Sequence, residues 1–62
     1  MNMFRITMLV SINDLPDLVQ ILSERTRDGH VYRETRIDED RWLLSIAVSD
    51  REEARFLRSY TF

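Results

Sequence analysis

The spacing of apolar residues differs between residues 4–11 and residues 15–22, and this difference limits what the chain can fold into. Residues 4–11 alternate between two faces. The apolar face carries Phe4, Ile6, Met8 and Val10, and the mixed face carries Arg5, Thr7, Leu9 and Ser11. A period of two is typical of a strand with one buried face, so the sequence predicts a first strand over residues 4–11.

A helical period follows this strand. Apolar residues recur at the offsets of one helical face, at Leu15, Leu18, Val19 and Leu22. Pro16 suits the first helical turn, where no backbone donor is lost, and Gly29 suits a left-handed C-terminal cap. The pattern predicts a helix from about Leu15 to Arg27, capped at its start by Asn13 or Asp14.

Two more strands and a short helix are predicted after the first helix. In the strand expected over residues 30–37, the inward positions would be Val31, Thr35 and Ile37 beside Arg33, and the outward ones Tyr32, Glu34 and Arg36. The acidic residues 38–40 are predicted to turn the chain, and residues 42–48 alternate as a third strand. Ser49 and Glu52 have the spacing of a capping box, which predicts a helix ending near Ser59.

The predicted order is therefore β-α-β-β-α in one α+β domain over residues 1–62. A right-handed crossover makes the first and third strands neighbours, with the second strand beyond the third. With both helices on one face, this is a ferredoxin-like arrangement with a three-stranded antiparallel sheet, whose fourth strand is absent or vestigial. The outer edge of the first strand would be closed by a short strand at residues 60–62, by a second copy of the chain, or by another protein.

The composition argues against several classes of site. The 62 residues include no cysteine and one histidine, so we expect no disulfide, no metal site and no cofactor. No nucleophile and base stand at a recognisable catalytic spacing, and we expect the protein not to be an enzyme. No apolar run is longer than that of residues 8–10, which is far shorter than the roughly 20 residues of a membrane span, so we expect no membrane partner. The chain start lacks the pattern of a signal peptide, and the expected location is the cytoplasm.

The cationic side chains are nine arginines, and the formal net charge is −2. Arg51, Arg55 and Arg58 recur at helical spacing, so one alternative function is nucleic-acid binding through this stripe. We disfavour it, because acidic residues interspersed with the arginines leave no long basic run. The outward positions of the first and third strands also lack the aromatic residues on which RNA-recognition modules stack bases.

The open face of the predicted sheet is the candidate contact surface for a protein partner. Its candidate residues are Arg5, Thr7, Leu9, Tyr32, Arg36 and Leu43. Aromatic and arginine side chains are enriched at the centres of protein interfaces. We therefore expect a small regulatory or inhibitory module that acts through this face or through the edge of residues 4–11, as a homodimer or on a larger protein. Its size fits the small inhibitors encoded by phages and mobile elements.

The segment FRITMLVSINDLPDLVQIL, residues 4–22, resembles the first strand, loop and helix of ACT domains. Asp14, Pro16 and Leu18 hold places comparable to the aspartate, proline and leucine of that family's loop. Asp17 stands where the family has a glycine. The resemblance implies a ferredoxin-like fold, side-by-side pairing and, as the first alternative function, the sensing of an amino acid. The loop residues that it implies as ligand-binding are Asn13, Asp14 and Leu15.

Overall fold

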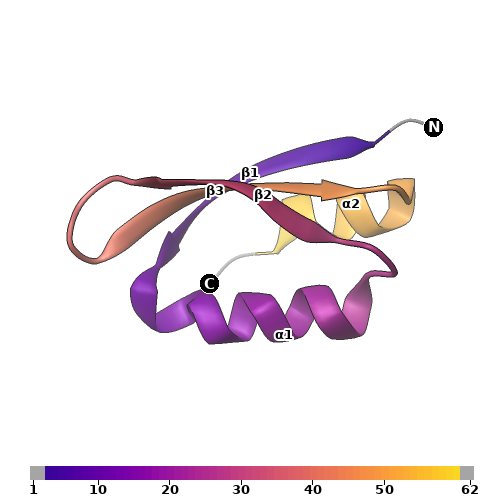
Figure 1. Ribbon diagram of the computed structural model, residues 1–62. Helices are drawn as coiled ribbons and strands as arrows, with labels where there is room; N and C mark the ends of the chain where they lie inside the picture. The colour runs from indigo at the N-terminus through magenta and orange to yellow at the C-terminus, as the bar shows by residue number, and fades with distance from the viewer. Residues whose placement is uncertain (1–2, 61–62) are drawn as a thin grey trace.

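The computed structural model describes residues 3–60, which form a three-stranded sheet with two helices on one of its faces (Figure 1). The elements in chain order are β1 (Phe4–Ser11), the short 3₁₀ helix η1 (Ile12–Asp14), α1 (Leu15–Arg25), β2 (His30–Arg36), β3 (Arg41–Val48) and α2 (Arg51–Ser59). Over these residues, no helix combines the length and the apolar character that crossing a membrane requires. The order of strands and helices is the predicted one.

The strand order in the sheet is β1-β3-β2, and both neighbouring pairs are antiparallel. β1 pairs with β3 without a break in register, from Phe4 opposite Val48 to Ser11 opposite Arg41. This confirms the predicted ferredoxin-like arrangement, in which α1 connects the parallel strands β1 and β2 across β3. Within residues 3–60, β1 and β2 are therefore the two edge strands.

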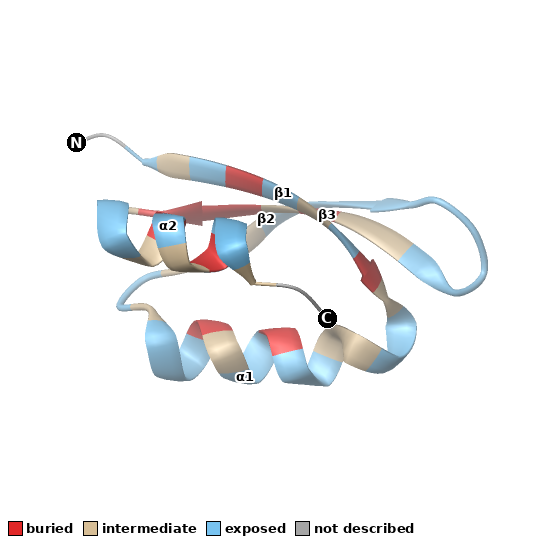
Figure 2. Ribbon diagram, turned by 180° about the vertical axis from the view of Figure 1, so that it is seen from behind, coloured by how far each residue is buried: buried red, intermediate tan, exposed pale blue. Residues whose placement is uncertain are grey.

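The core lies between the sheet and the two helices. Its buried side chains are Ile6, Val10, Leu18, Leu22, Leu44, Ile46, Val48, Ala54 and Leu57. The buried positions of α1 face the sheet (Figure 2). Each fully buried large aliphatic side chain stabilises the fold by about 1.5–3 kcal/mol relative to exposure, so burial of these residues is a major contribution to stability.

α1 differs from its prediction in the face it buries and in where it ends. Val19 is 63% exposed, and Ile21 is half-buried in its place. The helix ends at Arg25 because Thr26 adopts an extended conformation. The backbone N–H and the hydroxyl of Thr26 both donate to the carbonyl of Leu22, which satisfies the last turn without a further helical residue.

Gly29 is not the left-handed cap that the sequence predicts, since no described residue has a positive φ. Its N–H donates to the Thr26 hydroxyl at 3.0 Å. A Cβ at this position would collide with the Thr26 side chain and lie 3.1 Å from a methyl group of Val48. Glycine is therefore required here by close packing of the loop and not by its backbone angles.

Asp50 caps α2, one residue after the predicted Ser49. The Asp50 carboxylate accepts the backbone N–H groups of Glu52 and Glu53, at 2.7 and 3.2 Å. Ser49 stays outside the helix, and its backbone N–H donates to Asp28 at 3.2 Å. Hydrogen bonding by the side chain and then by the backbone of Ser49 lowers the pKa of the Asp28 carboxyl. This contact ties the loop after α1 to the start of α2.

A β-bulge interrupts the pairing of β2 with β3. Val31 lies opposite Ile46 on the helix side of the sheet. The next paired residue is Arg33, opposite Ser45, which leaves Tyr32 as the extra residue. An extra residue on one strand moves every later side chain of that strand to the other face.

The bulge makes the predicted faces wrong for the second half of β2. Glu34 lies opposite Leu44, which is buried under the helices, and Arg36 continues that face. Arg33 and Thr35, predicted to point inward, lie on the open face instead. The period of two in the sequence carries no sign of the bulge, because both faces of this strand are polar.

Two further predictions concern residues at the ends of elements. Ile37, expected inward, follows the last residue of β2 and is 49% exposed. The suggested fourth strand at residues 60–62 lies outside the described residues except for Tyr60. The Tyr60 N–H donates to the Leu57 carbonyl at 3.2 Å, and its ring lies against Phe56. Tyr60 thus belongs to the C-terminal cap of α2.

Candidate functional site

The backbone of β1 presents hydrogen-bonding groups on the outer edge of the sheet. The Ile12 N–H donates to the Asp40 carbonyl at 2.7 Å, in the same register as the β1–β3 pairs. Antiparallel pairs alternate between positions that bond to each other and positions whose backbone groups point away. Even-numbered residues of β1 therefore bond to β3, and the N–H and carbonyl groups of Arg5, Thr7 and Leu9 point outward.

The outer edge of β1 has few features that prevent a further strand from pairing with it. Its register is continuous, and Arg5 is its one charged side chain. Leu9 is 50% exposed, and Phe4 and Met8 are only half-buried. Among residues 3–60 no strand pairs with this side of β1. A regular, apolar and unpaired edge is a template for another strand.

The outer edge of β2 has the opposite character. The Ile37 N–H donates to the Arg41 carbonyl at 3.0 Å, in register with the pairs after the bulge. The same alternation directs the backbone groups of Glu34 and Arg36 outward. Both residues are charged and exposed, and the bulge at Tyr32 interrupts the strand. Charges and bulges are the devices by which sheets prevent edge-to-edge pairing.

On the open face, Arg5 and Tyr32 meet above the central strand. The guanidinium carbon of Arg5 lies 5.8 Å from the centre of the Tyr32 ring. Ala47 lies opposite Arg5 on β3, between the two edge strands, and is only 6% exposed. A cation–π contact at an exposed site contributes about 0.5–1 kcal/mol. The Arg5–Tyr32 contact therefore connects β1 to β2 across β3 and shields the small residue beneath it.

The structure brings most of the predicted contact residues together. The open face carries Arg5, Thr7, Leu9, Tyr32 and Leu43. Arg36 is the exception, because the bulge places it on the helix side, where its Nε donates to the Asp38 carbonyl at 3.2 Å. Arg33 and Thr35 join the open face in its place. The contact surface is therefore more polar along β2 than the sequence indicated.

The residues of the predicted ligand loop lie in different surroundings. The Asn13 N–H donates to the Ser11 hydroxyl at 3.2 Å within η1, and Asn13 is exposed. Asp14 occupies the N-cap position of α1 without a capping bond from its side chain. Leu15 is half-buried against the core. Leu15 thus serves packing, whereas Asn13 and Asp14 belong to η1 at the junction between β1 and α1.

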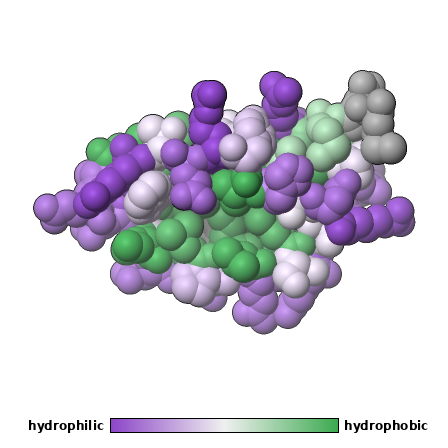
Figure 3. Space-filling view, viewed as in Figure 1, coloured by the Kyte–Doolittle hydropathy of each residue, from purple (hydrophilic) through white to green (hydrophobic). Residues whose placement is uncertain are grey.

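An apolar groove, which sequence reasoning missed, lies between α1 and the β2 side of the sheet (Figure 3). It has a volume of about 260 Å³, and Trp42 contributes to its wall. Val19 and Ile12, both well exposed, also line it, and Glu34 is its one charged lining residue. The groove could not be inferred from the sequence, because the helical period of α1 predicts that Val19 is buried in the core. The groove is suited to an apolar side chain or a small apolar molecule.

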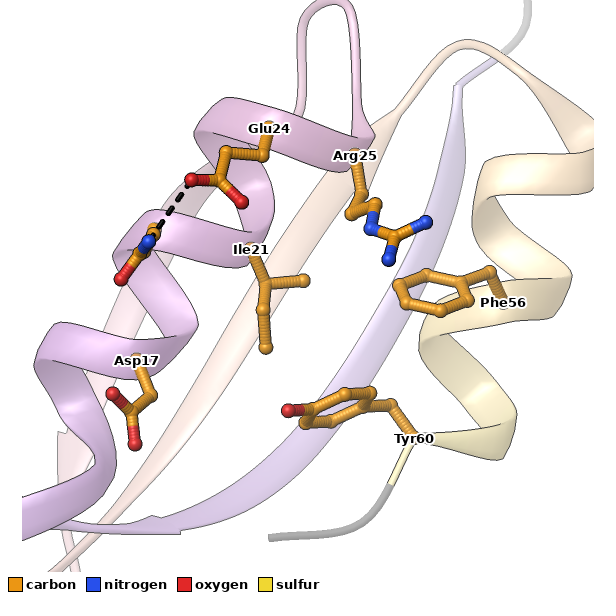
Figure 4. Close-up of a pocket in the computed structure, with 7 residues that line it drawn as sticks. Asp17, Ile21, Glu24, Arg25, Phe56 and Tyr60 are labelled. Carbon is orange, nitrogen blue, oxygen red and sulfur yellow. Dashed lines mark hydrogen bonds between the residues drawn. The ribbon is translucent and has the colours of Figure 1, made fainter.

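A second cleft, of about 340 Å³, separates α1 from α2 (Figure 4). Ile21 and Arg25 are directed from α1 toward the rings of Phe56 and Tyr60. The guanidinium carbon of Arg25 lies 5.6 Å from the centre of the Phe56 ring, and Asp17 lines the same cleft. The cleft thus combines an arginine, the carboxylates of Asp17 and Glu24 and aromatic walls, which are groups that can bind a small zwitterion. Sequence reasoning missed it, because it joins residues distant in the chain.

The acidic turn between β2 and β3 stabilises itself. The Asp38 carboxylate accepts the backbone N–H groups of Asp40 and Arg41, each at 2.9 Å, and the Arg41 Nε at 2.8 Å. The hydrogen bond from the Arg41 side chain is the largest cause of the lowered pKa of Asp38. Over residues 3–60 no cluster of three or more metal-ligating side chains is found. Asp38 therefore closes the turn.

The arginines of α2 form an exposed stripe of Arg51, Arg55 and Arg58. Arg55 Nη1 lies 3.8 Å from Glu52 Oε1. Ion pairs this exposed contribute about 0–1 kcal/mol, so the pair does little to fix the arginine. The acidic neighbours on the same helix reduce the positive potential of the stripe.

Comparison with known proteins gives no match to a protein-family model, to a curated protein or to a solved structure. Among the candidate sites of the described residues, the outer edge of β1 combines the most features of a binding surface. Outward backbone groups, exposed apolar side chains and unbroken register coincide at the outer edge of β1.

Proposed function

We propose that this protein is a non-catalytic binding module that receives a strand of a protein partner along the outer edge of β1 and so regulates that partner. The observation that carries the proposal is the contrast between the two edges. β1 offers the backbone of Arg5, Thr7 and Leu9 from a regular apolar strand, whereas charged residues and a bulge protect β2. Backbone hydrogen bonds supply the affinity of strand addition, and alternate side chains supply its specificity.

The open face extends this contact. A strand added to β1 continues the sheet, so its alternate side chains lie beside those of Thr7 and Leu9. Leu9 lies opposite Leu43, which gives the face an apolar pair next to the edge. The partner that suits this surface is an extended segment with apolar residues at alternate positions.

Proline at matched outward positions tests the proposal. Thr7→Pro removes an outward donor from β1, and Glu34→Pro removes one from β2. Proline is tolerated at edge positions whose N–H faces away from the sheet. We expect both variants to fold, as judged by circular dichroism.

The readout is capture from cells that express the protein. A tagged copy of each variant is co-expressed with an untagged copy, and the captured proteins are identified by mass spectrometry. We expect the partner to be held by the unmodified chain and by Glu34→Pro but lost from Thr7→Pro. Equal capture by the two folded proline variants would contradict strand addition at β1.

ACT-type sensing of an amino acid is a second candidate function, favoured by one observation. In the cleft between α1 and α2, the Phe56 ring holds the Arg25 guanidinium, and Asp17 supplies a carboxylate. These groups would bind the carboxylate and the ammonium of an amino acid. Calorimetry with each common amino acid tests this, with Arg25→Met as the control that keeps the stem and removes the charge. Stoichiometric heat that Arg25→Met abolishes would support sensing, and no heat from any amino acid would exclude it.

Nucleic-acid binding through Arg51, Arg55 and Arg58 makes a different prediction. Its affinity would fall steeply with salt, because phosphate contacts release counterions. Strand addition at an edge with one charge would depend only weakly on salt.

A further inference from the structure

We infer that the strand added to β1 is β1 of a second copy of this chain, paired antiparallel about a two-fold axis at Thr7. The inference rests on the proposed function and names its partner. The product is a continuous six-stranded antiparallel sheet with the four helices on one face. Three observations support it: the phase of the outward backbone groups, the charge pattern of β1 and the difference between the two edges.

The phase of the backbone groups permits self-pairing. The outward groups belong to odd-numbered residues of β1. Antiparallel pairing requires that each residue with outward groups lies directly opposite a residue of the other strand that also has outward groups. An axis at Thr7 places Thr7 opposite its own copy and Arg5 opposite Leu9 of the second copy. Each outward N–H of Arg5, Thr7 and Leu9 then faces an outward carbonyl of the second copy, so the backbone groups of these three residues are paired.

The charge pattern of β1 suits pairing with itself. Arg5 is its one charged residue and lies away from the proposed axis, so it faces the neutral Leu9 of the second copy. Like charges directly opposite each other would destabilise the pair, and this register avoids them. On the helix side, Phe4 would lie opposite Val10 and Met8 opposite Ile6 of the second copy. The half-buried Phe4 and Met8 would thereby bury more of their apolar surface.

The difference between the two edges favours a closed dimer. Pairing β1 with β1 uses the same surface on both copies, so no β1 edge remains open in the dimer. The two β2 strands then lie at the ends of the sheet. Those ends carry the bulge at Tyr32 and the outward residues Glu34 and Arg36. Pairing β1 with β2 would instead create an open-ended fibre, which the protected edge opposes.

Cysteine crosslinking tests the axis, because the chain contains no cysteine. In the proposed dimer the two Thr7 Cα atoms are about 5.5 Å apart, the spacing of a hydrogen-bonded antiparallel pair. Leu9 lies opposite Arg5 of the second copy, four residues along the strand from the second Leu9, so the two Leu9 Cα atoms are about 14 Å apart. With the shortest bifunctional thiol reagent, we expect Thr7→Cys to yield at least about tenfold more crosslinked dimer than Leu9→Cys, given this difference in separation.

Mixing the two variants tests the register. If Thr7→Cys crosslinks to Leu9→Cys more than to itself, the axis lies at Met8 and the proposed register is wrong. Weak crosslinking of every combination, with dimer present in solution, would place the interface elsewhere and overturn the proposal.

Analytical ultracentrifugation separates failure of this inference from failure of the proposed function. We expect the unmodified chain and Glu34→Pro to be dimers and folded Thr7→Pro to be a monomer. A monomeric unmodified chain would overturn self-pairing. In that case strand addition by another protein would stand if Thr7→Pro alone lost a captured partner, and both proposals would fail if it kept that partner.

Discussion

The two edge strands pair with the same central strand, yet their outer edges differ in every property that governs strand addition. β1 has unbroken register, one charge and exposed apolar side chains, whereas β2 has a bulge and charged residues at its outward positions. An edge is thus defined by the phase of its backbone groups and by the side chains beside them, and not by strand length alone. In this sheet the β1 edge carries few of the features that prevent strand addition, and the β2 edge carries several.

The largest expected effect is on stability, and it comes from placing proline at an inward instead of an outward position of β1. Ile6→Pro removes an N–H that bonds to β3 and a side chain that is buried in the core. We expect a cost of about 3 kcal/mol or more, a large share of the stability of a small domain. Circular dichroism should show a cooperative thermal transition for Thr7→Pro but not for Ile6→Pro. A folded Ile6→Pro would mean that the hydrogen-bond phase assigned to β1 is wrong.

The next effect comes from removing the protection of β2. Deleting Tyr32 closes the bulge, and Glu34→Thr with Arg36→Thr removes the charges at the outward positions. We expect this triple variant to form large assemblies, since both edges would then accept strands. Light scattering against protein concentration measures this. The control is Glu34→Thr with Arg36→Thr and Tyr32 retained, which should assemble less. A triple variant of unchanged size would show that the bulge and the charges of β2 do not prevent strand addition.

A smaller effect concerns the turn that joins β2 to β3. The pKa of Asp38 is lowered from 3.8, so its ionised form stabilises the fold above that pH, and this contribution is lost as pH falls through the folded pKa. We expect Asp38→Asn to lower the melting temperature at about pH 7 and to differ little from the unmodified chain at about pH 2. Asp40→Asn, on the same turn, is the control. An equal deficit at both pH values would show that ionisation of Asp38 does not matter.

The smallest effect distinguishes the edge from the open face. Leu43→Asp places a charge on the central strand, away from the outer edge of β1. Because the proposed contact is made by the β1 backbone, we expect the fold to persist and the dissociation constant to change by about threefold or less, which is under 1 kcal/mol. Sedimentation over a range of concentrations measures it. Loss of the complex would identify the face as the main contact.

The residue pattern predicted the fold where apolar periodicity was strong. β1 alternates cleanly and was placed at its observed bounds, and the three-stranded order followed from the handedness of the crossover. The β1 part of the candidate site followed as well, because Arg5, Thr7 and Leu9 occupy the mixed face of that strand. The hydrogen-bond phase needed the structure, since it depends on which side of β1 its neighbour lies.

The errors occurred where side chains give no periodic signal. β2 is polar on both faces, so nothing in its sequence marks Tyr32 as an extra residue, and Arg36 was assigned to the wrong face. The predicted cap of α2 is one residue before the observed one, because Ser49 and Asp50 are both good capping residues. Val19 fits the helical period of α1 but stays exposed, because the sheet beneath that end is covered incompletely.

Amide hydrogen exchange measured residue by residue shows whether a strand pairs with the outer edge of β1. At protein concentrations where the complex forms, we expect the Thr7 amide, which points away from β3, to be as well protected as that of its inward neighbour Ile6. The Glu34 amide, at the equivalent outward position of β2, should exchange rapidly. If the Thr7 amide exchanges as fast as that of Glu34 in the assembled protein, no strand pairs with β1, and strand addition at this edge is excluded.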